Sequence, residues 1–295
     1  MKRTNLLADS KIAALYQGVP AAEMDEFRRF LRTHPYREFS YQNEDWAYII
    51  TEPREETVLL LPGALCAPEV SWKSISGLED KYRVIAPEYP PVKSMDTLVE
   101  GIAAILRREG IDHAHVVGGS YGGFVAQIFA RRHPRFTRSL VLSHTLPPNS
   151  EGEESIRKAT RTLSLLPGGL LRWIMGKRLG GLMPERTEET AGLHAIYQEM
   201  LHYRLTKADI LGILWRTADF HDQKFSPADL STWNGRMLIL LADNDPGTPD
   251  EVRARLTGLY PQAKVHLFHG SGHATAVTQQ EEYQKVILEF LQANP

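Results

Sequence analysis

The sequence contains one cysteine, Cys66, among 295 residues. A single thiol cannot form an intramolecular disulfide, and it cannot supply a zinc site that is built from several cysteines. No stretch approaches the roughly 20 apolar residues that a membrane span needs. Asp9 and Lys11 interrupt the basic start of the chain before a secretory apolar core forms. These absences predict a cytoplasmic protein without a membrane span.

Charge of neither sign is in excess. The 34 lysines and arginines nearly balance the 36 aspartates and glutamates, so the net charge is −2 at pH 7. This balance gives no electrostatic reason to expect nucleic acid or an anionic membrane as a partner. The apolar content of 42% is ordinary for a globular protein, and the length suffices for one large core or two modest ones. We expect a monomer or a homodimer.

Short apolar segments alternate with helical patterns from residue 57 onward. The segment 58–61 has no polar alternation, which is typical of a strand covered on both faces. Helices are predicted over 95–108 and 121–132. This alternation predicts right-handed βαβ units and a parallel sheet. The core strands are expected at 58–61, 82–86, 113–117, 139–143, 236–241 and 265–268.

Two parts of the chain lack this alternation of strands and helices. Residues 1–35 carry helical patterns and predict an N-terminal helical extension, after which an antiparallel hairpin is expected across the polar turn 42–45. Residues 146–225 contain several amphipathic helical patterns and no convincing strand. We interpret them as a helical cap inserted into one α/β core domain, which is made of residues 36–145 and 226–295.

A serine flanked by glycines follows the strand at 113–117. Gly118, Ser120 and Gly122 form the pattern G-x-S-x-G, which indicates a tight turn from a strand into a helix. Only small residues fit two positions before and after the serine of such a turn. The turn holds the hydroxyl over the carboxyl end of a parallel sheet, where a ligand can reach it.

A serine hydroxyl becomes a nucleophile when a histidine takes its proton and an acid orients that histidine. The turn resembles the nucleophile elbow of the α/β-hydrolases, and this resemblance implies that nucleophile, acid and histidine follow one another in that order along the chain. The strand at 139–143 is followed by no carboxylate. The loop after the strand at 236–241 contains two, Asp243 and Asp245, so either residue is a candidate for the acid.

Residues 57–295 resemble the α/β-hydrolase superfamily. The resemblance implies a mostly parallel eight-stranded sheet with helices on both faces and an inserted helical cap. The segment 242–249 is similar to the family's acid loop, with Asp245 in the catalytic place. Asp243 is the second choice, and a turn or capping role explains it better.

The same resemblance covers the loop after the last strand. Residues 270–274, Gly-Ser-Gly-His-Ala, are similar to the family's G-G-H loop and imply that His273 is the base. His266 lies within the last strand and His269 at its end, so both are better explained as structural. The set Ser120, Asp245 and His273 then appears in the family's order along the chain.

An oxyanion hole needs backbone N–H groups that point at the negative oxygen of a tetrahedral intermediate. The residue after the nucleophile supplies one, which is the N–H of Tyr121. The second comes from the loop after the strand at 58–61, and the family resemblance assigns it to Ala64, with Leu65 as a weaker alternative. The family often has His-Gly in this loop, whereas this chain has Pro62-Gly63.

The substrate pocket is harder to predict than the nucleophile. Cys66 lies near the oxyanion loop, but a lone apolar cysteine is usually a packing residue. His144 ends a core strand, and a hydrogen bond would explain it as well as a place in the pocket. As lining residues we expect Leu65, His144, Trp173 and Trp215.

The resemblance favours a serine hydrolase that cleaves a carboxylic ester or lactone of small to medium apolar character through an acyl-enzyme, with no metal or cofactor. Two alternatives use the same residues: hydrolysis of a C–C bond in a dienoic diketone, and cofactor-free perhydrolysis. A third is a non-catalytic binding protein, because the segment 82–90 also resembles maspardin-like members of the superfamily. A scaffold does not need a complete triad, which favours the enzyme.

Overall fold

The computed structural model contains one eight-stranded sheet with the strand order β1-β2-β4-β3-β5-β6-β7-β8. It describes residues 9–149 and 153–293. The sheet is parallel from β4 to β8, whereas β2 is antiparallel to both β1 and β4. The predicted mostly parallel eight-stranded sheet is confirmed. Its strands are β1 (Tyr36–Tyr41), β2 (Glu44–Ile50), β3 (Thr57–Leu61), β4 (Arg83–Glu88), β5 (Ala114–Gly119), β6 (Thr137–Ser143), β7 (Arg236–Ala242) and β8 (Lys264–Phe268).

The hairpin of β1 and β2 turns more tightly than predicted. Gln42 and Asn43 have φ angles of 52° and 63°, and Tyr41 already pairs with Glu44. Two successive residues with positive φ match the right-handed twist of the flanking strands, so they suffice to reverse the chain. Glu44 and Asp45, which the sequence placed in the turn, therefore belong to β2.

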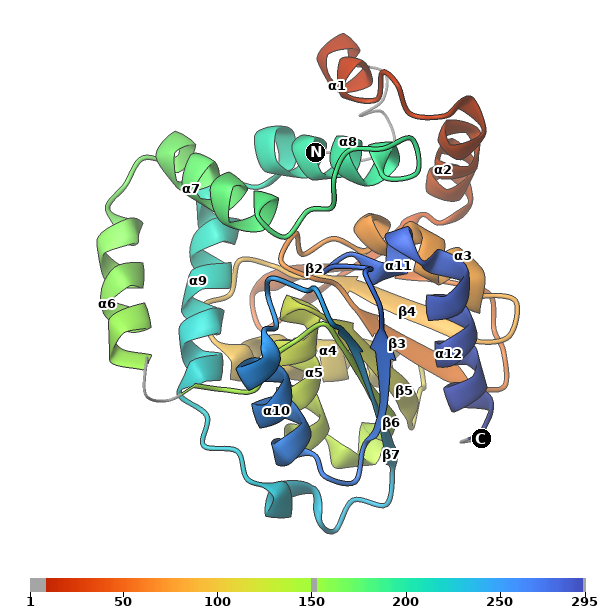
Figure 1. Ribbon diagram of the computed structural model, residues 1–295, viewed down its shortest axis with the longest axis vertical. Helices are drawn as coiled ribbons and strands as arrows, with labels where there is room; N and C mark the ends of the chain where they lie inside the picture. Colours follow the sequence, from red (N-terminus) through yellow and green to blue (C-terminus); the bar gives the residue numbers. More distant parts are fainter. Residues whose placement is uncertain (1–8, 150–152, 294–295) are drawn as a thin grey trace.

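Helices cover both faces of the sheet, with α3 and α12 on one side and α4, α5 and α10 on the other (Figure 1). All five residues of β3 are buried, as its lack of polar alternation predicted. The covering helices are α3 (Trp72–Leu78), α4 (Met95–Arg108), α5 (Tyr121–Arg132), α10 (Asp250–Leu259), α11 (Thr275–Thr278) and α12 (Gln280–Gln292).

Helix α4 shows how the sequence sets the ends of an element. The Ser94 hydroxyl accepts a hydrogen bond from the Thr97 N–H at 3.4 Å, which caps the first turn. Arg107 and Arg108 lie in the last turn, where the helix dipole favours positive charge. Gly110 follows with a φ of 67°, a conformation that ends helices. The helix has the bounds that the sequence predicted.

Between β6 and β7 the described residues form helices and no strand. We call these elements the helical insertion; they lie at one end of the molecule, partly beside and partly above the sheet (Figure 1). Among the described helices of the chain, none combines the length and the apolar character that a bilayer crossing requires. The insertion comprises α6 (Glu153–Ser164), α7 (Gly168–Gly180), α8 (Ala191–Glu199), the π-helical turn η5 (Met200–Arg204) and α9 (Lys207–His221).

Among the described residues, four short segments of π- or 3₁₀-helix were not predicted from the sequence. One is the π-helical turn η5, which continues α8 without a break. The others are 3₁₀ turns that begin at proline, whose fixed φ angle suits the first position of a helix. They are η2 (Pro68–Ser71), η3 (Pro134–Phe136) and η6 (Pro227–Leu230).

The N-terminal helices α1 (Ser10–Leu15) and α2 (Ala21–Thr33) pack on two different parts of the chain. The Tyr16 hydroxyl donates a hydrogen bond of 2.6 Å to Glu199 of the insertion. Phe27 and Phe30 contact the ring of Trp72 on α3, with centroid distances of 5.6 and 6.2 Å. The first eight residues of the predicted extension lie outside the described residues. The extension thus bridges the insertion and the sheet domain.

The packing of α4 on β2 generates a stability prediction. A Cβ atom at Gly101 would lie within 3.0 Å of three ring atoms of Trp46, which is only 1% exposed. We expect Gly101→Ala to lower the free energy of unfolding by about 2–3 kcal/mol, because the ring cannot move without opening the core. Gly258 of α10 has open space around it, so Gly258→Ala should raise the free energy of unfolding by up to about 1 kcal/mol. Urea denaturation measures both, and equal effects would contradict the prediction.

Candidate active site

Ser120 sits on a turn of one residue between β5 and α5, with a φ of 51° and a ψ of −122°. A Cβ atom at Gly118 would lie within 3.0 Å of the Gly122 carbonyl oxygen, and one at Gly122 would lie equally close to the Leu61 carbonyl oxygen. Both positions must therefore lack a side chain, as the motif predicted. The Ser120 N–H donates to the Ser143 carbonyl oxygen at 2.9 Å, which anchors the turn to β6.

The three residues that the sequence singled out are joined by hydrogen bonds. The Ser120 hydroxyl oxygen lies 2.9 Å from His273 Nε2, and His273 Nδ1 lies 2.9 Å from each carboxylate oxygen of Asp245. Ser120 follows β5, Asp245 follows β7 and His273 follows β8. The parallel sheet brings these positions together because the carboxyl ends of its strands share one edge.

Asp245 is 3% exposed, and both of its carboxylate oxygens accept hydrogen bonds. The Gly247 N–H donates to one carboxylate oxygen at 2.7 Å, and the Thr248 hydroxyl donates to the other at 2.9 Å. Burial works to raise the pKa of Asp245, but the hydrogen bonds and charge of His273, with those two donors, outweigh it and hold the pKa below its usual range. Asp245 is therefore an anion that orients His273.

Asp243, the second choice for the acid, lies apart from His273. It accepts hydrogen bonds from the His269 ring at 2.8 Å and from the Gly270 N–H at 2.9 Å. These contacts fasten the loop after β8 to the loop after β7, which agrees with the structural roles expected for Asp243 and His269. His266 contacts Glu282 on α12 at 3.2 Å, away from the site.

The loop after β3 runs along the first turn of α5. A Cβ atom at Gly122 would also lie within 3.0 Å of the Pro62 carbonyl oxygen, so the two segments are in direct contact. Among the described residues, no hydrogen bond uses the N–H of Ala64 or of Tyr121. Cys66 closes the loop with a φ of 60° and an N–H that donates to the Gly63 carbonyl oxygen. Burial raises the pKa of its thiol to about 12, so the thiol stays protonated.

His144, expected in the pocket, lies behind His273. It is 4% exposed, and its ring centroid is 6.1 Å from that of His273. Its Nδ1 lies 2.8 Å from the Ser143 hydroxyl, and its Nε2 lies 2.6 Å from the Thr275 hydroxyl. Burial, together with the nearby charge of His273, lowers the pKa of His144 to about 4. With both nitrogens occupied, His144 supports the site rather than facing a ligand.

The other expected pocket residues lie in different surroundings. Leu65 is buried directly after the loop that contains Ala64. Trp215 is half-buried on α9. Trp173 is 61% exposed on α7 and borders a groove between α7 and α8 on the outside of the insertion. With its ring largely exposed, Trp173 makes no contact with the triad that the structure shows, and its place in the substrate pocket stays a prediction.

The sequence analysis did not identify Arg216, a buried cation beside Tyr121, the residue that follows Ser120. It is 1% exposed on α9; its Nε donates to the Tyr121 hydroxyl and its Nη1 to the Pro90 carbonyl oxygen, both at 2.7 Å. Its Nη2 lies 3.7 Å from the Cys66 sulfur. No carboxylate of the described residues forms an ion pair with it. The adjacent pair Trp215-Arg216, which follows the apolar residues 210–214 of α9, was the signal that could have found it.

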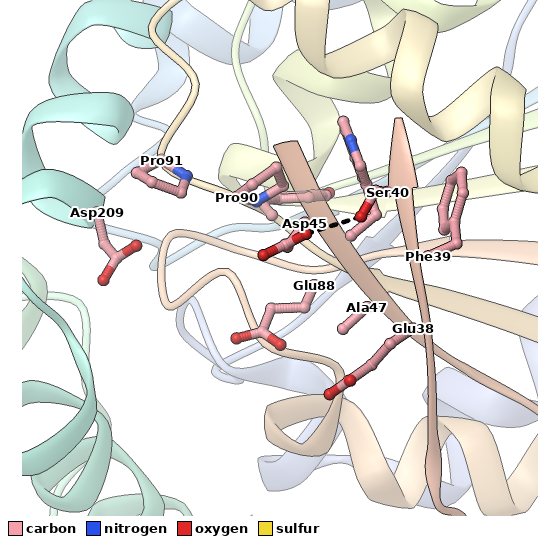
Figure 2. A pocket seen from close by; sticks show the side chains of 11 residues that line it. Glu38, Phe39, Ser40, Asp45, Ala47, Glu88, Pro90, Pro91 and Asp209 are labelled. Carbon is pink, nitrogen blue, oxygen red and sulfur yellow. Dashed lines mark hydrogen bonds between the residues drawn. The ribbon is translucent and has the colours of Figure 1, made fainter. Parts of the chain in front are cut away.

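A separate pocket of about 570 Å³ lies between the β1–β2 hairpin, the loop after β4 and α9 (Figure 2). Carboxylates from three different segments line it, including Asp45, which accepts a hydrogen bond from the Ser40 hydroxyl at 2.9 Å. It contains neither Ser120 nor His273. In the part of the chain that the structure describes, no three His, Cys, Asp or Glu side chains are grouped as metal ligands. The acidic residues that line the pocket are Glu38, Asp45, Glu88 and Asp209.

The bond between Arg216 and Tyr121 gives a first prediction for the site. Tyr121→Phe removes only the hydroxyl and leaves a buried guanidinium N–H without its acceptor. We expect the free energy of unfolding to fall by about 1–3 kcal/mol. Tyr203 is 42% exposed, so Tyr203→Phe is the matched control and should change stability by less than about 0.5 kcal/mol. Urea denaturation would refute the prediction if the two variants behave alike.

The buried His144 gives a prediction for pH. Its pKa is about 4 in the folded chain and about 6.5 in the unfolded chain, so between these values the unfolded state binds the extra proton. Stability from a neutral His144 is therefore complete above pH 6.5 and is lost as the pH falls toward 4. The cost of His144→Asn should shrink by up to about 3 kcal/mol over that interval. Denaturation of both proteins at several pH values measures it, and a cost independent of pH contradicts it.

Comparisons with known proteins identify the family of the chain. The sequence profile of the alpha/beta hydrolase family matches residues 58–286. A 2-hydroxy-6-oxononadienedioate/2-hydroxy-6-oxononatrienedioate hydrolase of Burkholderia vietnamiensis is 26% identical over 230 residues, 71% of this chain and 76% of that protein. Among solved structures, a hydrolase of Pseudomonas aeruginosa aligns with a TM-score of 0.73 at 18% identity, over 87% of this chain and 98% of its own. A thermophilic esterase of Thermogutta terrifontis aligns with a TM-score of 0.69 at 22% identity, over 88% and 98%. Because the family profile spans most of the chain, the protein belongs to the alpha/beta hydrolase family.

Proposed function

We propose that this protein is a serine hydrolase that cleaves a carboxylic ester or lactone of small to medium apolar character through an acyl-enzyme. The observation that carries the proposal is the continuous hydrogen-bonded series Ser120–His273–Asp245, with 2.9 Å at each step. A binding protein has no need of a base aligned with a serine on a strained turn. Membership of a hydrolase family is consistent with catalysis.

In the proposed reaction, Ser120 attacks the ester carbonyl carbon while His273 Nε2 takes the hydroxyl proton. Asp245 stabilises the imidazolium that forms. The negative carbonyl oxygen accepts hydrogen bonds from the N–H groups of Ala64 and Tyr121, which have no other acceptor among the described residues. His273 then protonates the departing alcohol. Water, activated by the same histidine, releases the acid and restores Ser120.

Charge near the site supports an uncharged ester over a dianionic substrate. Arg216 is the buried cation next to Tyr121, and protein atoms already occupy its three nitrogens. A substrate with two carboxylates would need free cations to replace its lost hydration. The thiol of Cys66 and the phenol of Tyr121 are both neutral, because burial raises the pKa of each.

A C–C bond hydrolase remains the second candidate function. It is favoured by the relative of Burkholderia vietnamiensis, whose name states hydrolysis of an oxo-dienedioate. The same serine and histidine serve both reactions, so the difference lies in what the pocket binds. Discrimination therefore needs substrates and not only a test of the serine.

Labelling by a fluorophosphonate probe tests the mechanism, because the probe reacts with an activated serine. We expect the parent protein to be labelled and Ser120→Ala to lose both labelling and hydrolysis of nitrophenyl esters by at least about 10³-fold. Ser231 is exposed in the loop before β7, and Ser231→Ala is the control that should keep both. Labelling that persists in Ser120→Ala, or is absent in the parent, overturns the proposal.

A substrate panel separates the two candidate reactions. Nitrophenyl esters of increasing acyl length and a dienoic diketone are compared at equal concentration by kcat/KM. Turnover of esters with little action on the diketone supports the ester hydrolase, and the reverse order supports the C–C hydrolase. A labelled serine with no turnover of either class would contradict both assignments.

A further inference from the structure

Positive charge is concentrated in one part of the helical insertion. Residues 155–184 contain six lysines and arginines and no aspartate or glutamate, although the net charge of the whole chain is −2. The overall balance, which gave no reason to expect an anionic membrane, therefore conceals a local excess. This stretch covers most of α6, the loop after it and all of α7, at the outer end of the molecule (Figure 1).

Most of these cations have no ion-pair partner among the described residues. Arg157 forms ion pairs with Asp219 and Asp222 on the neighbouring α9. Within residues 9–149 and 153–293, no carboxylate lies within ion-pair distance of the other five. Acidic residues resume only at Glu185, beyond the far end of α7. The free cations are Lys158, Arg161, Arg172, Lys177 and Arg178.

The same stretch exposes large apolar side chains. Leu165 is 83% exposed in the loop between α6 and α7, Trp173 is 61% exposed and Leu170 is 43% exposed. Leu170, Trp173 and Lys177 are spaced by three and four residues, so they share one face of α7. The opposite face is packed, because Leu171 and Met175 are buried. Helix α7 therefore presents an apolar and basic face that no described residue covers.

A groove of about 810 Å³ continues this face between α7 and α8. No carboxylate lines it, and its polar side chains are basic or neutral. Tyr197 at its base donates a hydrogen bond of 2.6 Å to the Gly176 carbonyl oxygen, which fixes α8 against α7. The groove could thus hold anionic groups beside the exposed apolar side chains. Its lining includes Arg172, Trp173, Lys177, His194, Tyr197 and His202.

We infer that this surface docks on an anionic lipid membrane. We call it the α7 face and define it by Leu165, Leu170, Trp173, Lys177 and Arg178. Apolar side chains enter the boundary between headgroups and acyl chains, while lysine and arginine contact lipid phosphates. The exposure of Leu165 favours lipid over an acidic protein, because a protruding leucine enters a soft acyl layer but needs a matching pocket on a protein.

Helix α7 also connects the α7 face to the active site. Leu182 follows α7 by two residues, and its Cδ2 lies 3.2 Å from the position that a Cβ of Gly247 would take. The same position is 3.1 Å from His273 Nδ1. Docking would therefore restrain the segment that contacts the loop carrying Asp245. Binding to lipid uses neither Ser120 nor hydrolysis, so it stands or falls separately from the proposed reaction.

Co-sedimentation with vesicles tests the inference on the full chain. Vesicles of phosphatidylglycerol mixed with phosphatidylcholine are compared with phosphatidylcholine alone, at 0.1 M and about 0.5 M salt. We expect binding to the anionic vesicles only, weakened by salt because the field of the cations is screened. Ser120→Ala should bind as the parent does. Equal binding to both vesicle types, or none to the anionic ones, overturns the inference and leaves the face to an acidic protein.

Matched variants test which residues carry the binding. Lys177→Gln with Arg178→Gln should weaken binding about 20-fold or more, since each cation contributes about fivefold. Arg29 and Arg32 are exposed on α2, and the same double change there should alter binding less than about threefold. Leu170→Ala should weaken binding about fivefold to tenfold. Leu267 is equally exposed, at 42%, on β8, and Leu267→Ala should have no effect. If a variant of the α7 face and its control weaken binding equally, the α7 face is not the binding surface.

Tryptophan fluorescence can test whether the contact with lipid lies on α7 itself. Of the five tryptophans, Trp173 is the one with 61% exposure. Brominated lipid should quench part of the emission of the parent protein and none of the emission of Trp173→Phe, while that variant keeps the thermal stability of the parent. Quenching that survives the substitution would mean that another surface meets the lipid.

Discussion

The contact between the first turn of α5 and the loop after β3 is the constraint on which the site depends. Two glycines, Gly118 and Gly122, bring backbone against backbone where a single methyl group would not fit. Because of this, β5 turns into α5 within one residue, and Ser120 takes a φ of 51°. A wider turn would carry the Ser120 hydroxyl away from His273, which belongs to a loop that comes from a different strand. The strain at Ser120 is therefore held by the packing of its neighbours.

Behind the triad, the protein uses hydroxyl groups and a neutral imidazole rather than charges. His144 contacts the Ser143 and Thr275 hydroxyls, and the Tyr283 hydroxyl donates to the Ser143 oxygen at 3.2 Å. A charged imidazole at His144 would repel the positive charge that His273 acquires in the proposed reaction. Burial, which lowers the pKa of His144, prevents that charge at neutral pH. The second layer of the site therefore fixes geometry without opposing the chemistry.

Much of this arrangement follows from local patterns in the sequence. The strand at 236–242 and the helix at 95–108 are set by apolar runs and end signals that act within a few residues. The G-x-S-x-G pattern is local as well, because its cause is one tight turn. The pairing of Asp245 with His273 rather than with His269 depended on the family resemblance, since both histidines follow both aspartates at similar distances along the chain.

Features that depend on tertiary packing were not accessible in the same way. Arg216 looks like a surface residue until α9 is placed against Tyr121. Trp173 and Trp215 have similar helical surroundings in the sequence, and only the packing of the helices leaves Trp173 61% exposed and Trp215 half-buried. The cations of 155–184 are plain in the sequence, but acidic residues elsewhere offset them in the net charge of the whole chain. The net charge of this segment alone shows the excess.

The cations of the helical insertion fall into two sets. Those that face the rest of the fold have acidic partners, whereas those of its outer face have none among the described residues. On the inner side, Arg204 contacts Glu69 and lies 3.7 Å from Glu199, which also accepts from Tyr16 of the N-terminal extension. Burial raises the pKa of Glu199, against the opposing effects of Tyr16 and Arg204. Here the fold satisfies each buried charge, as stability requires.

The outer cations contribute nothing comparable to the fold. Lys177 and Arg178 have no acidic partner among the described residues, and Trp173 beside them gains little by remaining in water. On α6, Lys158 and Arg161 are three residues apart, so their like charges repel each other and cost some stability. A stretch that is unfavourable for folding and well suited to an anionic apolar boundary is better explained by a ligand than by the fold. The helical insertion thus has one side whose charges are paired with the rest of the fold and an outer side whose cations are left for a ligand.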